Sequence, residues 1–204
     1  MLELSVPAQP NWRIASVASK IKQLVRSPAD VLYYSGHGLL GSGKLVIDTQ
    51  GLPCPTPTLG TYQDWLGPAD LTPVWRSPMD LDVLILAGCS VLRIDFSSSP
   101  PTGPGLAWTS LLTAKGGPLV ALLGYQRSAP CDSPNGNAIA KAMALRMAAG
   151  STNYARDWLT ANGDNNAINA VAMDAKGYWW IEPLIDIPIF GKVSYGIKGP
   201  MTLP

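Results

Sequence analysis

The stretch Asp82-Val-Leu-Ile-Leu-Ala87 carries the strongest strand signal in the chain. A continuous apolar run of this length is typical of a parallel strand that is covered on both faces. Two similar runs, Val31-Leu-Tyr-Tyr34 and Pro118-Leu-Val-Ala-Leu-Leu123, lie before and after it. Strands that alternate with helices predict an α/β fold, a mostly parallel central sheet with helices on both faces.

Helical segments are predicted between and after these strands. Residues 14–26 place apolar side chains at helical spacing, and Ser27-Pro28 ends this helix because a residue before proline is disfavoured in the helical region. Further helices are expected at 61–66, 106–114, 137–149 and 153–176, the last with a break near Gly163. We also expect a hairpin-like stretch at 44–48 and a covering strand and loop from Tyr178 onwards.

Length and composition fit one folded domain. The chain has 204 residues, of which 47 % are hydrophobic and 14 % charged, and this composition excludes intrinsic disorder. The stretches at 51–58 and 97–105 are rich in Pro, Gly or Ser but short enough to be loops, and no shift in composition marks a linker. We therefore expect a single domain over residues 1–204.

Charge and hydropathy exclude several classes of partner. Fifteen Lys and Arg against fourteen Asp and Glu leave a net charge of +1, so no overall field attracts nucleic acid or an anionic membrane. No apolar run approaches the ~18 residues of a membrane span, and the first residues lack the plan of a signal peptide. The sequence predicts a cytoplasmic protein without a nucleic-acid or membrane partner.

Three cysteines and one histidine limit the reactive side chains. Cys54, Cys89 and Cys131 cannot all pair with one another, so at least one thiol is free. A zinc site made of these thiols and His37 is disfavoured, because no closely spaced pair of cysteines is present to start it. We expect neither a metal ion nor an organic cofactor.

His37 and Cys89 each follow a predicted strand. Ligands of open α/β sheets bind beyond the carboxyl ends of the strands, so parallel neighbouring strands would place both side chains at one edge. A thiol there can attack a carbonyl, and an imidazole can protonate the leaving amine. The backbone amides of Gly38 and Cys89 are the candidates for an oxyanion hole, since glycine lets the backbone approach a substrate.

These two segments resemble the caspase-like cysteine peptidases of clan CD. One apolar block ends in His-Gly, Val31-Leu-Tyr-Tyr-Ser-Gly-His-Gly38, and the other ends in a small residue and Cys, Val83-Leu-Ile-Leu-Ala-Gly-Cys-Ser90. The histidine precedes the cysteine by 89 − 37 = 52 residues, close to the caspase separation of about 50. Tyr-Tyr-Ser-Gly-His-Gly is similar to metacaspases, Gly-Cys-Ser to separases, and the order of elements after the cysteine to CHAT domains.

The resemblance implies a three-layer caspase-like sandwich and a cysteine endopeptidase that acts on a peptide or protein substrate. It assigns the nucleophile to Cys89, which forms an acyl-enzyme, and proton transfer or polarisation to His37. By analogy with CHAT domains, the loop after the third strand lines the primary side-chain pocket through Gln126, Arg127 and Asp132. Asp132 favours a cationic side chain of the substrate and Arg127 an anionic one, and both alternatives stand.

The chain departs from the family in three places. Ala87 stands where metacaspases have an acid that selects basic side chains, and the Gln-Ala-Cys-Arg-Gly block of animal caspases is missing. Neither a basic nor an aspartate preference is therefore supported. Caspase-like sandwiches begin with a strand before the first helix, and only residues 2–6 offer one. If that strand or a regulatory partner domain is missing, the domain depends on another chain.

Two other hypotheses stay open. The chain can be a catalytically inactive caspase-like module for interaction or regulation, since a cysteine after a buried strand is commonly a small core residue and a histidine there a turn residue. It can also be a thiol acyltransferase that uses the same nucleophile. A Ser90 nucleophile is disfavoured, because the Gly-x-Ser-x-Gly elbow is absent from the sequence.

Overall fold

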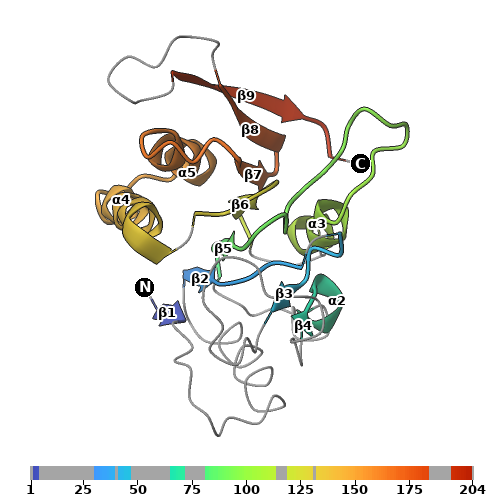
Figure 1. Cartoon of the computed structure of the whole chain (residues 1–204), viewed down its shortest axis with the longest axis horizontal. Coiled ribbons are helices and arrows are strands. Elements are labelled where there is room, and N and C mark those ends of the chain that lie inside the picture. Colours follow the sequence, from blue (N-terminus) through green and yellow to red (C-terminus); the bar gives the residue numbers. More distant parts are fainter. Residues whose placement is uncertain are drawn as a thin grey trace, which may run out of the picture.

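The structure, a computed structural model, describes residues 2–4, 30–39, 41–46, 65–71, 81–113, 119–130, 132–183 and 194–203. Its strands are β1 (Leu2–Leu4), β2 (Val31–Ser35), β3 (Leu45–Val46), β4 (Trp65–Leu66), β5 (Val83–Ala87), β6 (Ala121–Tyr125), β7 (Ala170–Asp174), β8 (Gly177–Pro183) and β9 (Tyr195–Met201). Its helices are α2 (Pro68–Leu71), α3 (Gly105–Thr113), the π-helical turn η1 (Asp132–Gly136), α4 (Asn137–Ala148) and α5 (Tyr154–Gly163) (Figure 1). The chain therefore has an α/β fold.

The main sheet is mixed. Its strand order is β1-β2-β5-β6-β7-β8-β9, and the neighbours from β1 to β6 run parallel. The neighbours from β6 to β9 run antiparallel, and β3 and β4 form a separate antiparallel pair. The expectation of a mostly parallel sheet is therefore corrected. Only two residues, 175 and 176, separate β7 from β8, and so short a turn can join antiparallel strands only.

The segment that follows α5 is a strand where we expected the helix of residues 153–176 to continue. Its sequence is rich in Ala and Met, which favour helices, but here it pairs with β6 on one side and β8 on the other. Asp174 Oδ1 accepts hydrogen bonds from the amides of Lys176 and Gly177, at 2.8 and 3.1 Å. These bonds stabilise the tight turn into β8. Pairing with β6 and β8 therefore outweighs the preference of residues 170–174 for a helix.

Other predicted elements lie close to their expected positions or outside the described residues. The helices expected at 106–114 and 137–149 are α3 and α4, and the hairpin-like stretch at 44–48 contains β3. Residues 65–66, expected at the end of a helix, form β4, and α2 begins only at Pro68. The helix expected at 14–26 lies outside the described residues, and so do Cys54 and Cys131.

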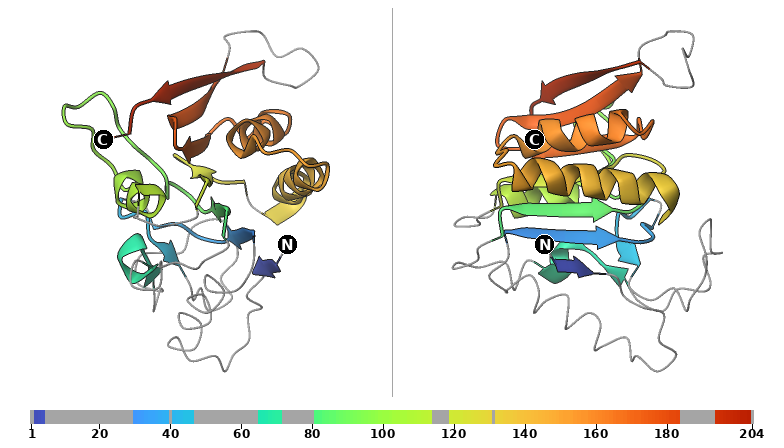
Figure 2. Two further views of the ribbon diagram at one scale, coloured as in Figure 1. Left: turned by 180° about the vertical axis from the view of Figure 1, so that it is seen from behind. Right: turned by 90° about the vertical axis from the view of Figure 1, so that its left-hand side faces the viewer.

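Helices cover both faces of the sheet, and each face has its own core (Figures 1 and 2). Leu84 and Leu86 of β5 share one core with Trp108 of α3. The opposite core contains the alternate residues of β5, Val83, Ile85 and Ala87, together with Met143 of α4 and Trp158 of α5. Both faces of the central strands are therefore packed. This packing holds the carboxyl ends of β2, β5 and β6 in place at one edge of the sheet.

The N-terminal strand β1 pairs in parallel with β2, with Leu2 beside Leu32 and Leu4 beside Tyr34. A strand thus lies within residues 2–6, the segment in which the sequence offered one before the first predicted helix. Among the helices of the described residues, none has both the length and the apolar character needed to span a bilayer.

Candidate functional site

Strands β2 and β5 bring His37 and Cys89 to one edge of the sheet. The strands are parallel neighbours, as expected, and their register pairs Ser35 with Ala87. His37 and Cys89 therefore each lie two residues beyond a pair of directly opposed residues. Figure 2 shows β2 and β5 side by side with their arrowheads at the same end. The carboxyl ends of adjacent parallel strands are the usual place of ligand sites in α/β sheets.

The turns after the two strands pack backbone against backbone. A Cβ atom at Gly38 would overlap the carbonyl oxygen of Cys89 and lie 2.7 Å from Val91 Cγ2 and 2.9 Å from the Cys89 nitrogen. A Cβ atom at Gly88 would lie 3.1 Å from the Gly38 nitrogen. No side chain therefore separates the two turns, and glycine at position 38 is required by this contact.

The amides of Gly38 and Cys89 are the expected oxyanion donors. Gly38 forms an isolated antiparallel β-bridge with Leu45. Two hydrogen bonds flank this bridge, from Leu39 N–H to Lys44 O at 2.8 Å and from Val46 N–H to His37 O at 2.9 Å. Gly38 thus occupies a non-hydrogen-bonded position, and its N–H points away from β3. Among the hydrogen bonds between described residues, the amides of Gly38 and Cys89 donate none. Neither amide is therefore engaged as a backbone hydrogen-bond donor within the described part of the chain.

The loop after β6 holds the thiol in place. The Ala129 N–H donates to Cys89 Sγ at 3.3 Å, and the Ser90 N–H donates to Arg127 O at 2.7 Å. Cys89 is half-buried, whereas Ser90 is only 4 % exposed. Ser90 has a φ of 59°, a left-handed conformation that is uncommon outside glycine and is found at sharp turns and functional sites. Cys89 is therefore more exposed than its neighbour Ser90.

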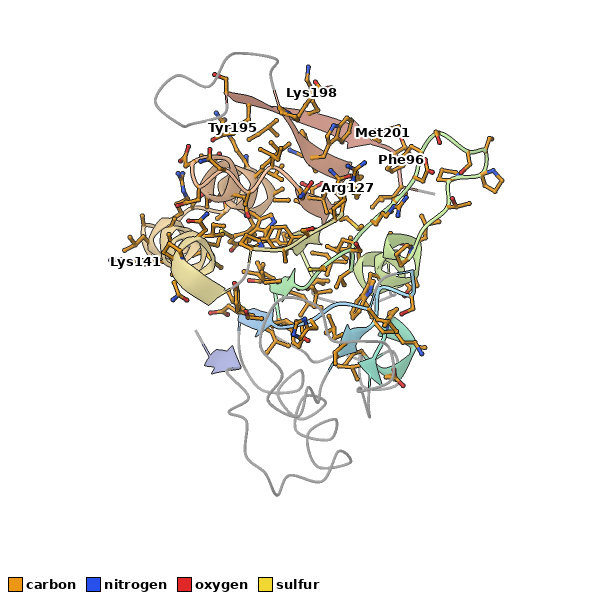
Figure 3. The ribbon with its side chains drawn as sticks, viewed as in Figure 1. Phe96, Arg127, Lys141, Tyr195, Lys198 and Met201 are labelled. Atoms are coloured by element: carbon orange, nitrogen blue, oxygen red, sulfur yellow. The ribbon has the colours of Figure 1, made fainter. Side chains whose placement is uncertain are left out.

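The predicted pocket residues lie in this loop, but only part of the pocket is described. Gln126 is half-buried, and its N–H donates to Asn169 O at 3.0 Å, which ties the loop to the start of β7. Arg127, which is labelled in Figure 3, is exposed. Asp132 begins η1, and its side chain lies outside the description. The structure therefore brings Arg127 and Gln126 into the segment that contacts Cys89.

Tyr125, the last residue of β6, connects this loop to the core. Burial raises its pKa well above the ordinary value, and the nearby Tyr33 and Cys89 raise it further. The hydroxyl therefore stays protonated and donates to Asn162 Oδ1 at 2.6 Å. Asn162 is fully buried and donates in turn to Trp158 O at 2.9 Å. This chain of bonds fixes the end of β6 against α5.

Two contributors to the site were missed by the sequence analysis. Ala129 acts through its backbone N–H, for which no side-chain signal exists. Tyr34 acts through a hydroxyl bond to His37 O at 2.9 Å, although its place in an apolar strand suggested a core role alone. Within the described ranges, no group of three or more His, Cys, Asp or Glu side chains is arranged to hold a metal ion.

Comparison of this chain with protein-family models, with curated proteins and with solved structures gives no significant match. The chemistry of the edge formed by His37 and Cys89 is therefore derived from its own geometry.

Gly38→Ala tests the backbone contact between the turns. We expect it to lower the free energy of unfolding by about 1–3 kcal/mol, since the new methyl group overlaps Cys89 and forces a backbone shift. Denaturant titration measures this loss, and alkylation of Cys89 should change in rate as its amide moves. Gly67→Ala is the matched control, because its nearest atom is a Lys44 side-chain carbon at 3.4 Å. Equal losses in both variants would contradict the contact.

Proposed function

We propose that the chain is a cysteine endopeptidase with a caspase-like fold, in which Cys89 and His37 hydrolyse peptide bonds. The observation that carries this proposal is the parallel, in-register pairing of β2 with β5, which brings both residues to one edge. The contact of Gly38 with the Cys89 backbone adds an amide pair beside the thiol. A nucleophile, a proton carrier and an oxyanion site are the parts that acyl transfer requires.

The reaction follows from these groups. The thiol proton of Cys89 passes to His37, and the sulfur attacks the carbonyl carbon of the peptide bond while the electron pair of the C=O bond moves to its oxygen. The amides of Gly38 and Cys89 bind that oxyanion. His37 gives a proton to the leaving amine as the C–N bond breaks, and a thioester remains on Cys89. Water then attacks the thioester with its proton passing to His37, which releases the acid and restores the thiol.

The loop after β6 supports an extended substrate at the same edge. It touches Cys89 through Ala129, and its Arg127 side chain is exposed. A substrate side chain next to the scissile bond would meet this loop. Arg127 favours an anionic group there, and Asp132 a cationic one. A peptide library decides between them.

The test uses a peptidyl electrophile that reacts with thiols, together with a fluorogenic peptide library. We expect mass spectrometry to find the electrophile on Cys89 rather than on Cys54 or Cys131, because an activated thiol next to a peptide site reacts first. We also expect the library to be cleaved, and a pretreated enzyme to be inactive.

Three other outcomes would contradict the proposal. Modification of Cys54 or Cys131 alone would remove Cys89 from the site. If no cysteine is modified selectively, the result would favour the inactive module. Transfer of an acyl group to an added amine, without hydrolysis, would favour the acyltransferase. The Cys54→Ser/Cys131→Ser variant is the control, since Cys89 is then the only thiol of the three in the sequence.

A further inference from the structure

The hydroxyl of Tyr34 joins the turn that carries His37 to β3. Tyr34 belongs to β2 and is buried in the core shared with α3. Its hydroxyl lies 2.9 Å from His37 O and 2.7 Å from Val46 O, so its single proton can be donated to either carbonyl group or shared between the two in a bifurcated bond. The Val46 N–H also donates to His37 O, at 2.9 Å. The main chain of His37 is therefore held by a side chain from β2 and by the backbone of β3.

The turn is shaped around the ring of Tyr34. A Cβ atom at Gly36 would lie 2.6 Å from Tyr34 Oη and 2.9 Å from Cζ, so the tyrosine occupies the space of a side chain at that position. On the β5 side, the Gly36 N–H donates to Ala87 O at 3.3 Å. The residue before His37 is thus held between Tyr34 and β5, the strand that leads to Cys89.

We infer that Tyr34 is a positioning residue, whose hydroxyl bonds to His37 and Val46 aim the imidazole at Cys89. This inference rests on the proposed function of the site. Gly38, directly after His37, packs on the Cys89 backbone, so a shift of the His37 main chain changes both the imidazole and an oxyanion amide. Proton transfer depends steeply on distance and direction, and small displacements lower the rate strongly.

The first test is Tyr34→Phe, which keeps the ring and removes the hydroxyl. We expect kcat for peptide hydrolysis to fall about tenfold with KM unchanged, which corresponds to the loss of one buried hydrogen bond. Tyr178→Phe is the matched control. Tyr178 is buried, and its hydroxyl donates to Leu92 O at 3.3 Å rather than to His37 O. This variant loses a similar bond and should keep the kcat of the wild type.

The second test needs no hydrolysis. The chain has a single histidine, so its ring-proton NMR signal belongs to His37 without further assignment. In the Cys54→Ser/Cys131→Ser background, alkylation of Cys89 with iodoacetamide should shift this signal. We expect the same shift in Tyr178→Phe and a smaller shift in Tyr34→Phe. Gly36→Ala disturbs the same turn and serves as a second variant if Tyr34→Phe does not fold.

The two tests separate this inference from the proposed function. An inactive wild type whose NMR shift depends on Tyr34 would overturn the peptidase and support the positioning role. An active wild type whose kcat and NMR shift are unchanged by Tyr34→Phe would overturn the positioning role alone. Equal losses of kcat in Tyr34→Phe and Tyr178→Phe would also overturn it, since a general loss of stability would then explain both.

Discussion

Cys89→Ala should lower peptide hydrolysis by at least about a thousandfold, because the thioester intermediate then has no sulfur on which to form. His37→Ala should cost nearly as much, and the double variant little more than either single one. Groups that act as a unit in one step are strongly non-additive. The measurement is kcat/KM on the best peptide from the library, with circular dichroism to confirm that each variant is folded.

Ser90→Gly is the control for this prediction. It removes the hydroxyl directly after Cys89 in the chain, and glycine accepts the φ of 59° without strain. We expect it to retain hydrolysis, since Ser90 is buried and its contact with Arg127 uses the backbone amide. Hydrolysis that survives Cys89→Ala but is lost in Ser90→Gly would transfer the nucleophile's role to the serine.

Trp158→Ala should lower the free energy of unfolding by about 3–5 kcal/mol. Trp158 is fully buried beneath the sheet, and its Nε1–H donates to Gly124 O at 3.2 Å. Its ring also packs edge-on against Tyr125, with centroids 5.4 Å apart. Truncation therefore leaves a large cavity and removes a hydrogen-bond donor from a carbonyl group of β6. Denaturant titration followed by circular dichroism measures the loss.

Trp179→Ala is the matched control for the loss of stability. This tryptophan is half-buried, and its Nε1–H donates to Asp174 Oδ1 at 3.1 Å near the β7–β8 turn. We expect a loss of only about 1 kcal/mol, since truncation of a half-buried side chain leaves a smaller cavity than truncation of a fully buried one. Equal losses in the two variants would mean that the core between the sheet and α5 contributes less than its burial indicates.

The central strands could be predicted because continuous runs of apolar residues indicate buried strands. The run at 83–87 is apolar throughout, and every one of its residues is buried in the structure. Such a feature depends on composition over a few consecutive residues, which a sequence displays directly. The parallel pairing of β2 with β5 was the condition on which the candidate site depended, and the structure meets that condition.

The missed features depend on contacts between distant segments. Residues 170–174 prefer a helix by composition and become β7 only because β6 and β8 offer two pairing edges. The Tyr34 hydroxyl meets Val46 twelve residues later, and the Ala129 amide meets Cys89 forty residues earlier. Neither bond leaves a pattern in the sequence, since each arises from where the chain returns after a loop.

The strands pair in parallel up to β6 and antiparallel after it, and we expect these two kinds of pairing to form at different stages of folding. Hairpins between neighbouring segments close quickly, whereas parallel pairing of distant segments must first overcome the entropy of a long loop. The stretch from β7 to β9 can thus form early, but β2 and β5 must meet across the loop between Ser35 and Val83. When the whole chain refolds, Cys89 and His37 therefore reach the same edge of the sheet only after that late encounter.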